Sequence, residues 1–309
     1  MEKIKKILIT GSNGLLGQKL VQLLTAMPNV ALFATARGKN RLPITSGYTY
    51  FSLDVTNESE INQLISTVKP DVVIHTAAMT NVDQCEVERE LCWELNVKAV
   101  ESLIKACAEN NVFLCHLSTD FIFDGIAGPY DENAQPNPIS YYGESKLAAE
   151  NLIRASNIKW AIARTVLVYG IVSDMSRTNI ILWLKKSLED GKTINVVTDQ
   201  FRTPTLAEDL AMGCWLIAKN EAQGIFNISG KDLLTPYDMA VKTADYFGLD
   251  KALINQADSS NFSQTAKRPP RTGFIIDKAI AKLGYNPHSF EQGIKLVSNQ
   301  FNSVSKIDN

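Results

Sequence analysis

Tyr142 and Lys146 stand four residues apart, at the start of a segment with a helical pattern that runs to about residue 155. Residues at this spacing lie on one face of a helix, so both side chains can reach one ligand. A phenol has a pKa near ~10 and transfers protons poorly at neutral pH unless a nearby cation stabilises its phenolate. Thr119 follows a predicted strand, where its hydroxyl can bind and orient a substrate oxygen. The three residues predict proton transfer at a bound oxygen; an exposed helix start is the competing interpretation of the pair.

A glycine-rich stretch, residues 7–17, precedes these groups and has the pattern of an apolar strand, a turn and a helix. Gly11 permits a tight turn, Gly14 lets a pyrophosphate approach the backbone, and Gly17 lets the helix pack on the strand. The helix N-terminus adds free N–H groups and a partial positive charge. An ordinary strand-to-helix loop is the alternative, but the apolar strand and helix on either side favour dinucleotide binding. The predicted cofactor contacts here are Gly11, Asn13, Gly14, Leu15, Leu16 and Gly17.

The end of the second predicted strand, residues 30–36, bears on the choice of nicotinamide cofactor. NAD-selective sites usually have a carboxylate at this point, whereas this chain has Arg37. A guanidinium can bind a 2′-phosphate through two hydrogen bonds, so Arg37 favours NADP(H), with NAD(H) as the alternative. A solvated loop charge is the competing interpretation.

Further cofactor contacts are predicted at the ends of the next strands. The Asp54 carboxylate can accept from an adenine amino group while Val55 packs on the ring, although a cap on the following helix explains Asp54 equally well. Mainly small residues after the fourth strand let ribose and nicotinamide lie against the backbone. These residues are Ala77, Ala78 and Met79, and Tyr142 and Lys146 complete the predicted cofactor contacts.

Short apolar strands alternate with amphipathic helices over about the first 170 residues, which predicts a parallel sheet covered on both faces. Ligands bind such sheets beyond the carboxyl ends of the strands. His75 and His116 lie inside the apolar strands and are interpreted as structural. The predicted fold is α/β, a Rossmann-type doubly wound parallel sheet with a smaller, interleaved C-terminal lobe. We expect residues 1–170, with 203–230 returning, to form the NADP-binding domain, and 171–202 and 231–300 the substrate-binding lobe.

Composition narrows the class of protein. The 309 residues are 45% hydrophobic and 21% charged, with a net charge of -2, as in a soluble globular protein. Without a long basic run or an apolar run long enough to span a bilayer, neither a nucleic-acid nor a membrane partner is expected. Five cysteines without a Cys-x-x-Cys pair favour reduced thiols in the cytoplasm and no metal site. The sequence leaves open whether the chain forms a homodimer.

The motifs together resemble those of the extended short-chain dehydrogenase/reductases and, within them, the dTDP-4-dehydrorhamnose reductase family. The similarity spans nearly the whole chain, and its more specific segments are Ser118-Thr119-Asp120 and Asp199-Gln200-Phe201. The resemblance implies a nucleotide-sugar substrate and a set of residues that contact it. These residues are Thr80, Val82, Asp83, Phe123, Gln200, Phe201, Arg202 and Arg268.

The resemblance also implies a reaction, the NADPH-dependent reduction of the 4-keto group of a nucleotide-linked 6-deoxyhexulose. Tyr142 would deliver a proton to the developing alkoxide, Thr119 would hydrogen-bond that oxygen, and Lys146 would tune Tyr142. Asp120 would relay protons or contact a sugar hydroxyl, with capping of the strand end as the alternative. Two other functions remain alternatives: a regulatory subunit similar to methionine adenosyltransferase beta, and a nucleotide-sugar epimerase or dehydratase.

The chain departs from the family pattern at two places. Phe121 stands where tyrosine is frequent, and Arg202-Thr203 replace a common Gly-Ser. We expect Arg202 to add a cation and bulk beside the nucleotide sugar, which leaves the identity of the sugar and base open.

Overall fold

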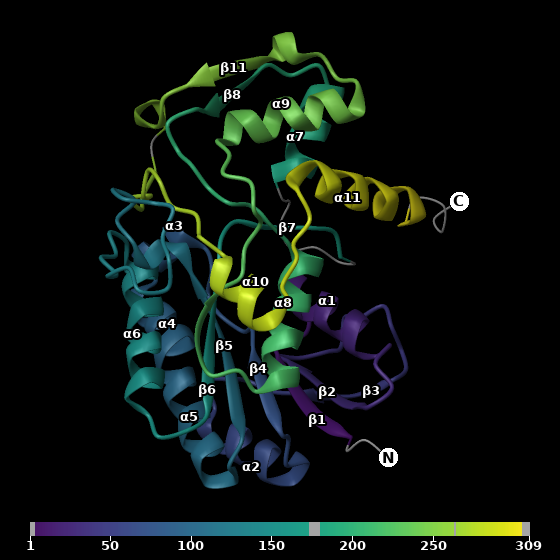
Figure 1. Ribbon diagram of the computed structural model, residues 1–309, viewed down its shortest axis with the longest axis vertical. Coiled ribbons are helices and arrows are strands. Elements are labelled where there is room, and N and C mark those ends of the chain that lie inside the picture. The colour runs from purple at the N-terminus through teal and green to yellow at the C-terminus, as the bar shows by residue number, and fades with distance from the viewer. Residues whose placement is uncertain (1–3, 173–179, 263, 305–309) are drawn as a thin grey trace.

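Seven parallel strands form the central sheet, in the order β10-β6-β5-β4-β1-β2-β3 (Figure 1). This computed structural model describes residues 4–172, 180–262 and 264–304. The strands are β1 (Lys5–Thr10), β2 (Val30–Ala36), β3 (Tyr48–Ser52), β4 (Val72–His75), β5 (Phe113–Thr119), β6 (Trp160–Thr165) and β10 (Gly224–Asn227).

Helices cover both faces of the sheet because successive strand residues point to opposite sides. Ile7 and Ile9 face the cluster that contains α1 and α8, whereas Leu8 faces the cluster that contains α2, α5 and α6. This arrangement confirms the predicted Rossmann-like α/β fold. The covering helices are α1 (Leu15–Leu24), α2 (Glu58–Val68), α5 (Ala99–Asn110), α6 (Tyr141–Ala155) and α8 (Ala207–Asn220).

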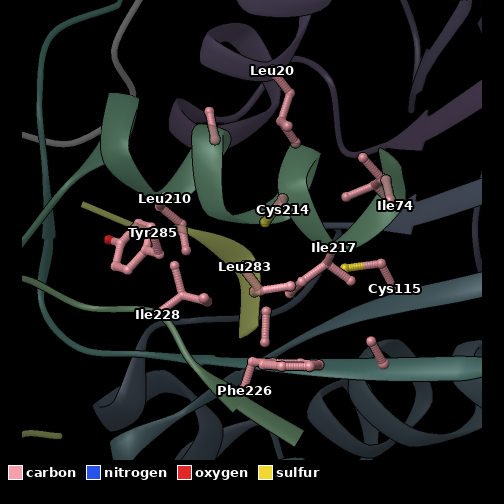
Figure 2. Close-up of a cluster of buried hydrophobic side chains, with 14 of the residues drawn as sticks. Leu20, Ile74, Cys115, Leu210, Cys214, Ile217, Phe226, Ile228, Leu283 and Tyr285 are labelled. Carbon is pink, nitrogen blue, oxygen red and sulfur yellow. The ribbon is translucent and has the colours of Figure 1, made fainter. Parts of the chain in front are cut away.

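The helix α8 anchors the core on its side of the sheet (Figure 2). Leu210, Cys214 and Ile217 lie on one face of α8 and are at most 1% exposed. Phe226 of β10 and Leu283 of α10 (Asp277–Leu283) belong to the same cluster. The late helix α10 therefore packs on the main sheet, although its residues fall in the segment 231–300 expected to form the lobe.

A smaller lobe lies beyond the carboxyl ends of the main strands, at the top of Figure 1. Its strands β8 (Ile194–Val197) and β11 (Ile254–Ala257) pair in parallel, and α7 (Ile180–Glu189) and α9 (Pro236–Phe247) pack on them. The helix α11 (Phe290–Val304) joins a second cluster there. The assignment of the two parts to cofactor and substrate stays a prediction, and residues 173–179 of the expected lobe lie outside the described residues.

Two short strands accompany the chain between the main sheet and the lobe. β7 (Val168–Tyr169) leads away from the sheet, and β9 (Thr205–Leu206) leads back into α8. The two strands pair in parallel with each other. The outgoing and returning chains are thus hydrogen-bonded side by side.

Three further helical segments directly precede α5. They are α3 (Val82–Val87), α4 (Arg89–Trp93) and a π-helical turn, Glu94–Lys98, that runs directly into α5. Within the described ranges, no helix is long and apolar enough to cross a membrane. All five cysteines are buried free thiols, as expected from their spacing.

Candidate active site

A cavity of about 710 Å³ lies at the carboxyl ends of β1, β4 and β5. Thr119, Asp120, Tyr142 and Lys146 all line it, so the structure brings the four predicted catalytic residues together with the glycine-rich turn. The other predicted residues that line it are Gly11, Asn13, Gly14, Leu15, Leu16, Gly17, Ala78, Thr80 and Val82.

The glycine-rich turn has the shape that a dinucleotide diphosphate needs. Gly11 has a φ of 74°, and a Cβ on Gly17 would lie 2.3 Å from the Gly11 carbonyl oxygen. The N-cap of α1 is Gly14, which gives no side-chain cap, and the first turn has no acidic residue. The N-terminal N–H groups of α1 are therefore available to an anion in the cavity, and this part of the site fits the expected cofactor.

Asn13 lines the cavity, but its side chain binds the loop after β2. Its Nδ2 donates to the Lys39 carbonyl at 2.9 Å, and its Oδ1 accepts from the Arg41 N–H at 3.0 Å. The loop that carries Arg37 is exposed and lies outside the residues that line the cavity. Asn13 thus fastens the cationic loop to the glycine-rich turn.

Asp54 and Val55 follow β3, also outside the cavity lining. The Asp54 carboxylate accepts from the backbone N–H and the hydroxyl of Thr56, and these bonds lower its pKa. The N-cap of α2 is Asn57, not Asp54. Asp54 thus closes a local turn, while its proposed adenine contact stays a prediction.

Tyr142 is placed by the first turn of α6, which Ser140 caps by accepting from the Gly143 N–H. Its ring meets Phe121 edge-on, with centroids 5.9 Å apart, and only 8% of the residue is exposed. Burial raises the pKa of Tyr142, and its hydrogen bond with Thr119 opposes the rise. Burial is the dominant influence on this pKa, and the tuning of Tyr142 by Lys146 stays a prediction.

Lys146 is 3% exposed and is held by β5. Its Nζ donates to the Leu117 carbonyl at 2.6 Å and lies 3.1 Å from Nε2 of His116. Burial lowers the pKa of Lys146 to about 8. The contact with His116 is absent from the sequence prediction, which placed this histidine correctly in the core but assigned it no role in the site.

Asn96, in the π-helical turn, is a second residue that the sequence analysis misses. Its amide accepts from the Met79 N–H at 2.8 Å and donates to the Met79 carbonyl at 3.1 Å. It also donates to the Ser145 hydroxyl at 3.0 Å. Asn96 thereby ties the segment after β4 to helix α6. The available signal in the sequence was a polar residue within an apolar helical face. Met79 itself is 7% exposed and, like Ala77, lies outside the cavity lining.

Asp120 is only 2% exposed and connects β5 to the loop that ends at Thr272. Its carboxylate accepts a hydrogen bond from the Thr272 hydroxyl and lies 3.9 Å from the Arg202 guanidinium. Burial raises the pKa of Asp120, and Arg202 opposes the rise. Asp120 therefore links the cavity lining to the loop at Thr272 and to Arg202.

Arg202 does not add a free cation to the substrate site, which corrects the expectation for this residue. It is 6% exposed and lies outside the cavity lining, because its guanidinium donates to the carbonyls of Phe201 and Pro269, each at 2.7 Å. Its side chain thus fixes the loop at 269–270. Gln200 and Phe201 lie on the same segment, outside the cavity lining.

Phe123 also requires a correction, because the structure places it in the core. It is 1% exposed, stacks on Tyr130 with centroids 4.1 Å apart, and meets Phe274 edge-on. The prediction that Phe123 contacts the substrate is therefore wrong.

Asp83 and Arg268 bind each other through two hydrogen bonds, at 3.2 and 2.6 Å. Arg268 lowers the pKa of Asp83. The pair connects α3 to the loop before residue 269, and contact of either residue with substrate stays a prediction.

Several residues that line the cavity carried no predicted role. Ser118 stands in a motif quoted for the resemblance and Phe121 at a departure from it, whereas the other residues of this group were assigned no part in the site. The group comprises Thr76, Leu117, Ser118, Phe121, Thr165, Leu167, Val168, Val172, Ile180 and Leu210.

Comparisons with known proteins identify a family and a shared fold. Residues 5–303 match the family described as RmlD substrate binding domain. Methionine adenosyltransferase 2 subunit beta of Xenopus laevis is 31% identical over 302 residues, covering 94% of this chain and 86% of that protein.

Two solved structures have the same fold at similar identities. A dTDP-4-dehydrorhamnose reductase of Clostridium acetobutylicum has a TM-score of 0.84 at 29% identity, covering 96% of this chain and 99% of that one. One from Bacillus anthracis, solved with NADP, has a TM-score of 0.81 at 26% identity, covering 96% and 99% of the two chains. The resemblance stated from the motifs is confirmed: the chain belongs to the RmlD substrate-binding domain family.

Proposed function

We propose that this protein is an NADPH-preferring reductase that converts the 4-keto group of a nucleotide-linked 6-deoxyhexulose to an alcohol, as in the formation of dTDP-L-rhamnose from dTDP-4-dehydrorhamnose. One observation carries the proposal. Thr119, Tyr142 and Lys146 line the same cavity as the free N-terminus of α1, which supplies an anion site beside a proton donor. Relatives of the family act on this class of substrate.

The glycine-rich turn and the N-terminus of α1 would hold the cofactor diphosphate, and Lys146 the nicotinamide ribose. A bound reduced nicotinamide supplies the hydride for the reduction. Arg37, on the exposed loop after β2, would bind the 2′-phosphate and so favour NADPH.

The chain's own residues then handle the proton. The Tyr142 phenol donates it to the alkoxide oxygen that develops at C4, and the Thr119 hydroxyl donates a hydrogen bond to the same oxygen. The raised pKa of Tyr142 keeps the phenol protonated, as a proton donor requires. The Lys146 ammonium stabilises the phenolate that remains after transfer.

Turnover tests the proposal directly. Purified protein is mixed with NADPH and dTDP-4-dehydrorhamnose, and the loss of NADPH absorbance is followed with analysis of the sugar product. We expect oxidation of NADPH and a 4-hydroxy product. No turnover by the wild-type protein would contradict the reductase assignment.

The identity to methionine adenosyltransferase 2 subunit beta supports a second candidate, a regulatory subunit that keeps the reductase fold. This candidate predicts complex formation with a methionine adenosyltransferase catalytic subunit, measured by calorimetry, and no reduction of the keto sugar. The cationic residue Arg37 and the Asp199-Gln200-Phe201 segment argue against the remaining alternative, an epimerase or dehydratase with tightly held NAD.

A further inference from the structure

His116 contacts the Lys146 amine but does not line the cavity and has no part in the mechanism described above. It belongs to β5, is 1% exposed, and its Nε2 lies 3.1 Å from Lys146 Nζ. The Leu117 carbonyl accepts a hydrogen bond from the same Nζ at 2.6 Å. A lysine ammonium has three N–H donors. These two acceptors occupy two of them and leave the third for a ligand in the cavity that Lys146 lines.

We infer that His116 is a positioning residue for Lys146: its neutral imidazole accepts a hydrogen bond from the ammonium and holds that charge at the cavity wall. The inference rests on the proposed function for the role of Lys146 in binding the nicotinamide ribose. It adds a residue that touches neither cofactor nor substrate.

The surroundings of His116 keep its imidazole neutral and restrict its rotation. Burial lowers the pKa of His116 well below its ordinary value, and the charge of Lys146 lowers it further. The ring stacks on His75, with centroids 5.4 Å apart, and Nδ1 of His75 lies 2.7 Å from the Thr10 hydroxyl. Because His116 carries no charge, it can accept from Lys146 through the Nε2 lone pair.

Lys146 needs such an acceptor because burial disfavours its charged form. Burial lowers its pKa to about 8, and Glu150 of α6 and Cys92 of α4 oppose this. Glu150 is already paired with Arg164, at 2.7 Å. The other titratable groups around Lys146 are His116 on β5, His75 on β4 and Tyr142 on α6. A hydrogen bond to the ammonium favours the charged state, so losing it lowers the pKa of Lys146.

The binding of NADPH across a range of pH tests the inference without turnover. Kd is measured by cofactor fluorescence from about pH 6 to 10 for the wild type, His116→Leu and His116→Gln. In the wild type we expect affinity to fall with a midpoint near the Lys146 pKa of about 8. In His116→Leu, which lacks the acceptor, we expect the midpoint to fall by about one pH unit and the affinity at pH 8 to fall about fivefold. His116→Gln retains an acceptor and should keep the wild-type midpoint.

His75→Phe is the matched control, since it removes the other buried histidine of the pair and keeps a ring to stack on His116. It should retain the wild-type midpoint. A wild-type midpoint in His116→Leu, an equal shift in His75→Phe, or a flat wild-type profile would each overturn the inference. Thermal unfolding checks that the variants fold; should His116→Leu not fold, His116→Asn, too short to reach Nζ, takes its place. Absent sugar reduction would reject the proposed function alone, because this readout needs only bound NADPH.

Discussion

Two regions at the carboxyl ends of the main strands differ in how far their charged and polar side chains are exposed to solvent. At the catalytic end, formed by Thr119, Tyr142 and Lys146, the side chains are less than 10% exposed and contact protein partners. At the cationic loop, residues 37–41, the side chain of Arg37 is exposed. Burial raises the pKa of Tyr142 and lowers that of Lys146 to about 8. Because the Arg37 charge stays exposed, the proposed selection of a ligand by this loop would cost little stability.

The largest contrast is expected between two Arg-carboxylate pairs. Glu150 pairs with Arg164 beneath the catalytic end, where the two side chains are 0% and 1% exposed. Glu150→Ala leaves a buried guanidinium without its partner, so we expect the free energy of unfolding to fall by about 3 to 5 kcal/mol. Denaturant titration measures it.

Asp83→Ala is the control for that substitution, because it breaks the 2.6 Å pair with Arg268, whose side chains are 39% and 21% exposed. We expect a loss of less than about 1 kcal/mol. Equal losses in the two variants would remove burial as the basis of the comparison.

Lys146→Met should increase stability at neutral pH while abolishing catalysis. The pKa of Lys146 is about 8 in the folded protein, against an ordinary 10.5, so the unfolded chain binds the proton more strongly. The charged lysine thus costs about 3 kcal/mol below pH 8, and wild-type stability recovers as pH rises from about 8 to 10.5. We expect the variant's advantage in unfolding free energy to shrink across that window. An advantage that is independent of pH would contradict the assigned pKa.

Tyr142→Phe removes the proton donor and keeps the ring that packs on Phe121. We expect kcat for keto-sugar reduction to fall by at least ~100-fold, with little change in the Kd for NADPH. Tyr141→Phe, one position away on α6, should leave kcat within about threefold of the wild type. A similar fall in both variants would show that the effect comes from the start of the helix and not from the Tyr142 hydroxyl.

Arg37→Ala tests the cationic loop. We expect Kd for NADPH to rise about tenfold or more while Kd for NADH changes little, since only NADPH carries the 2′-phosphate. Arg154→Ala, an exposed arginine near the end of α6, is the control for general charge effects. An equal change for NADPH and NADH in Arg37→Ala would reject selection by this residue.

The fold and the core of the site could be predicted because their signals are local. The glycine spacing from Gly11 to Gly17 specifies a turn that has no room for a Cβ, and strand alternation specifies two covered faces. Thr119, Tyr142 and Lys146 follow from their positions at a strand end and a helix start.

Other positions depended on contacts between distant segments. Arg202 appears in the sequence as a free loop cation, but carbonyls 67 and 68 residues further along occupy its guanidinium. Phe123 stands beside the catalytic motif, yet its ring turns into the core against Phe274. Neither His116 nor Asn96 could be assigned a role, because local pattern shows that a polar residue is buried but not which group it binds.

The chain passes from the main sheet to the lobe and back, and this order has a consequence for synthesis of the chain. β10, the last strand of the main sheet, follows the first half of the lobe, so the edge of β6 stays unpaired until residue 227 is made. Neither part is a contiguous stretch that a ribosome can complete and release to fold first. An exchange of lobes between relatives would therefore have to replace the lobe segments before and after α8 together. It would also have to preserve the pairing of β7 with β9.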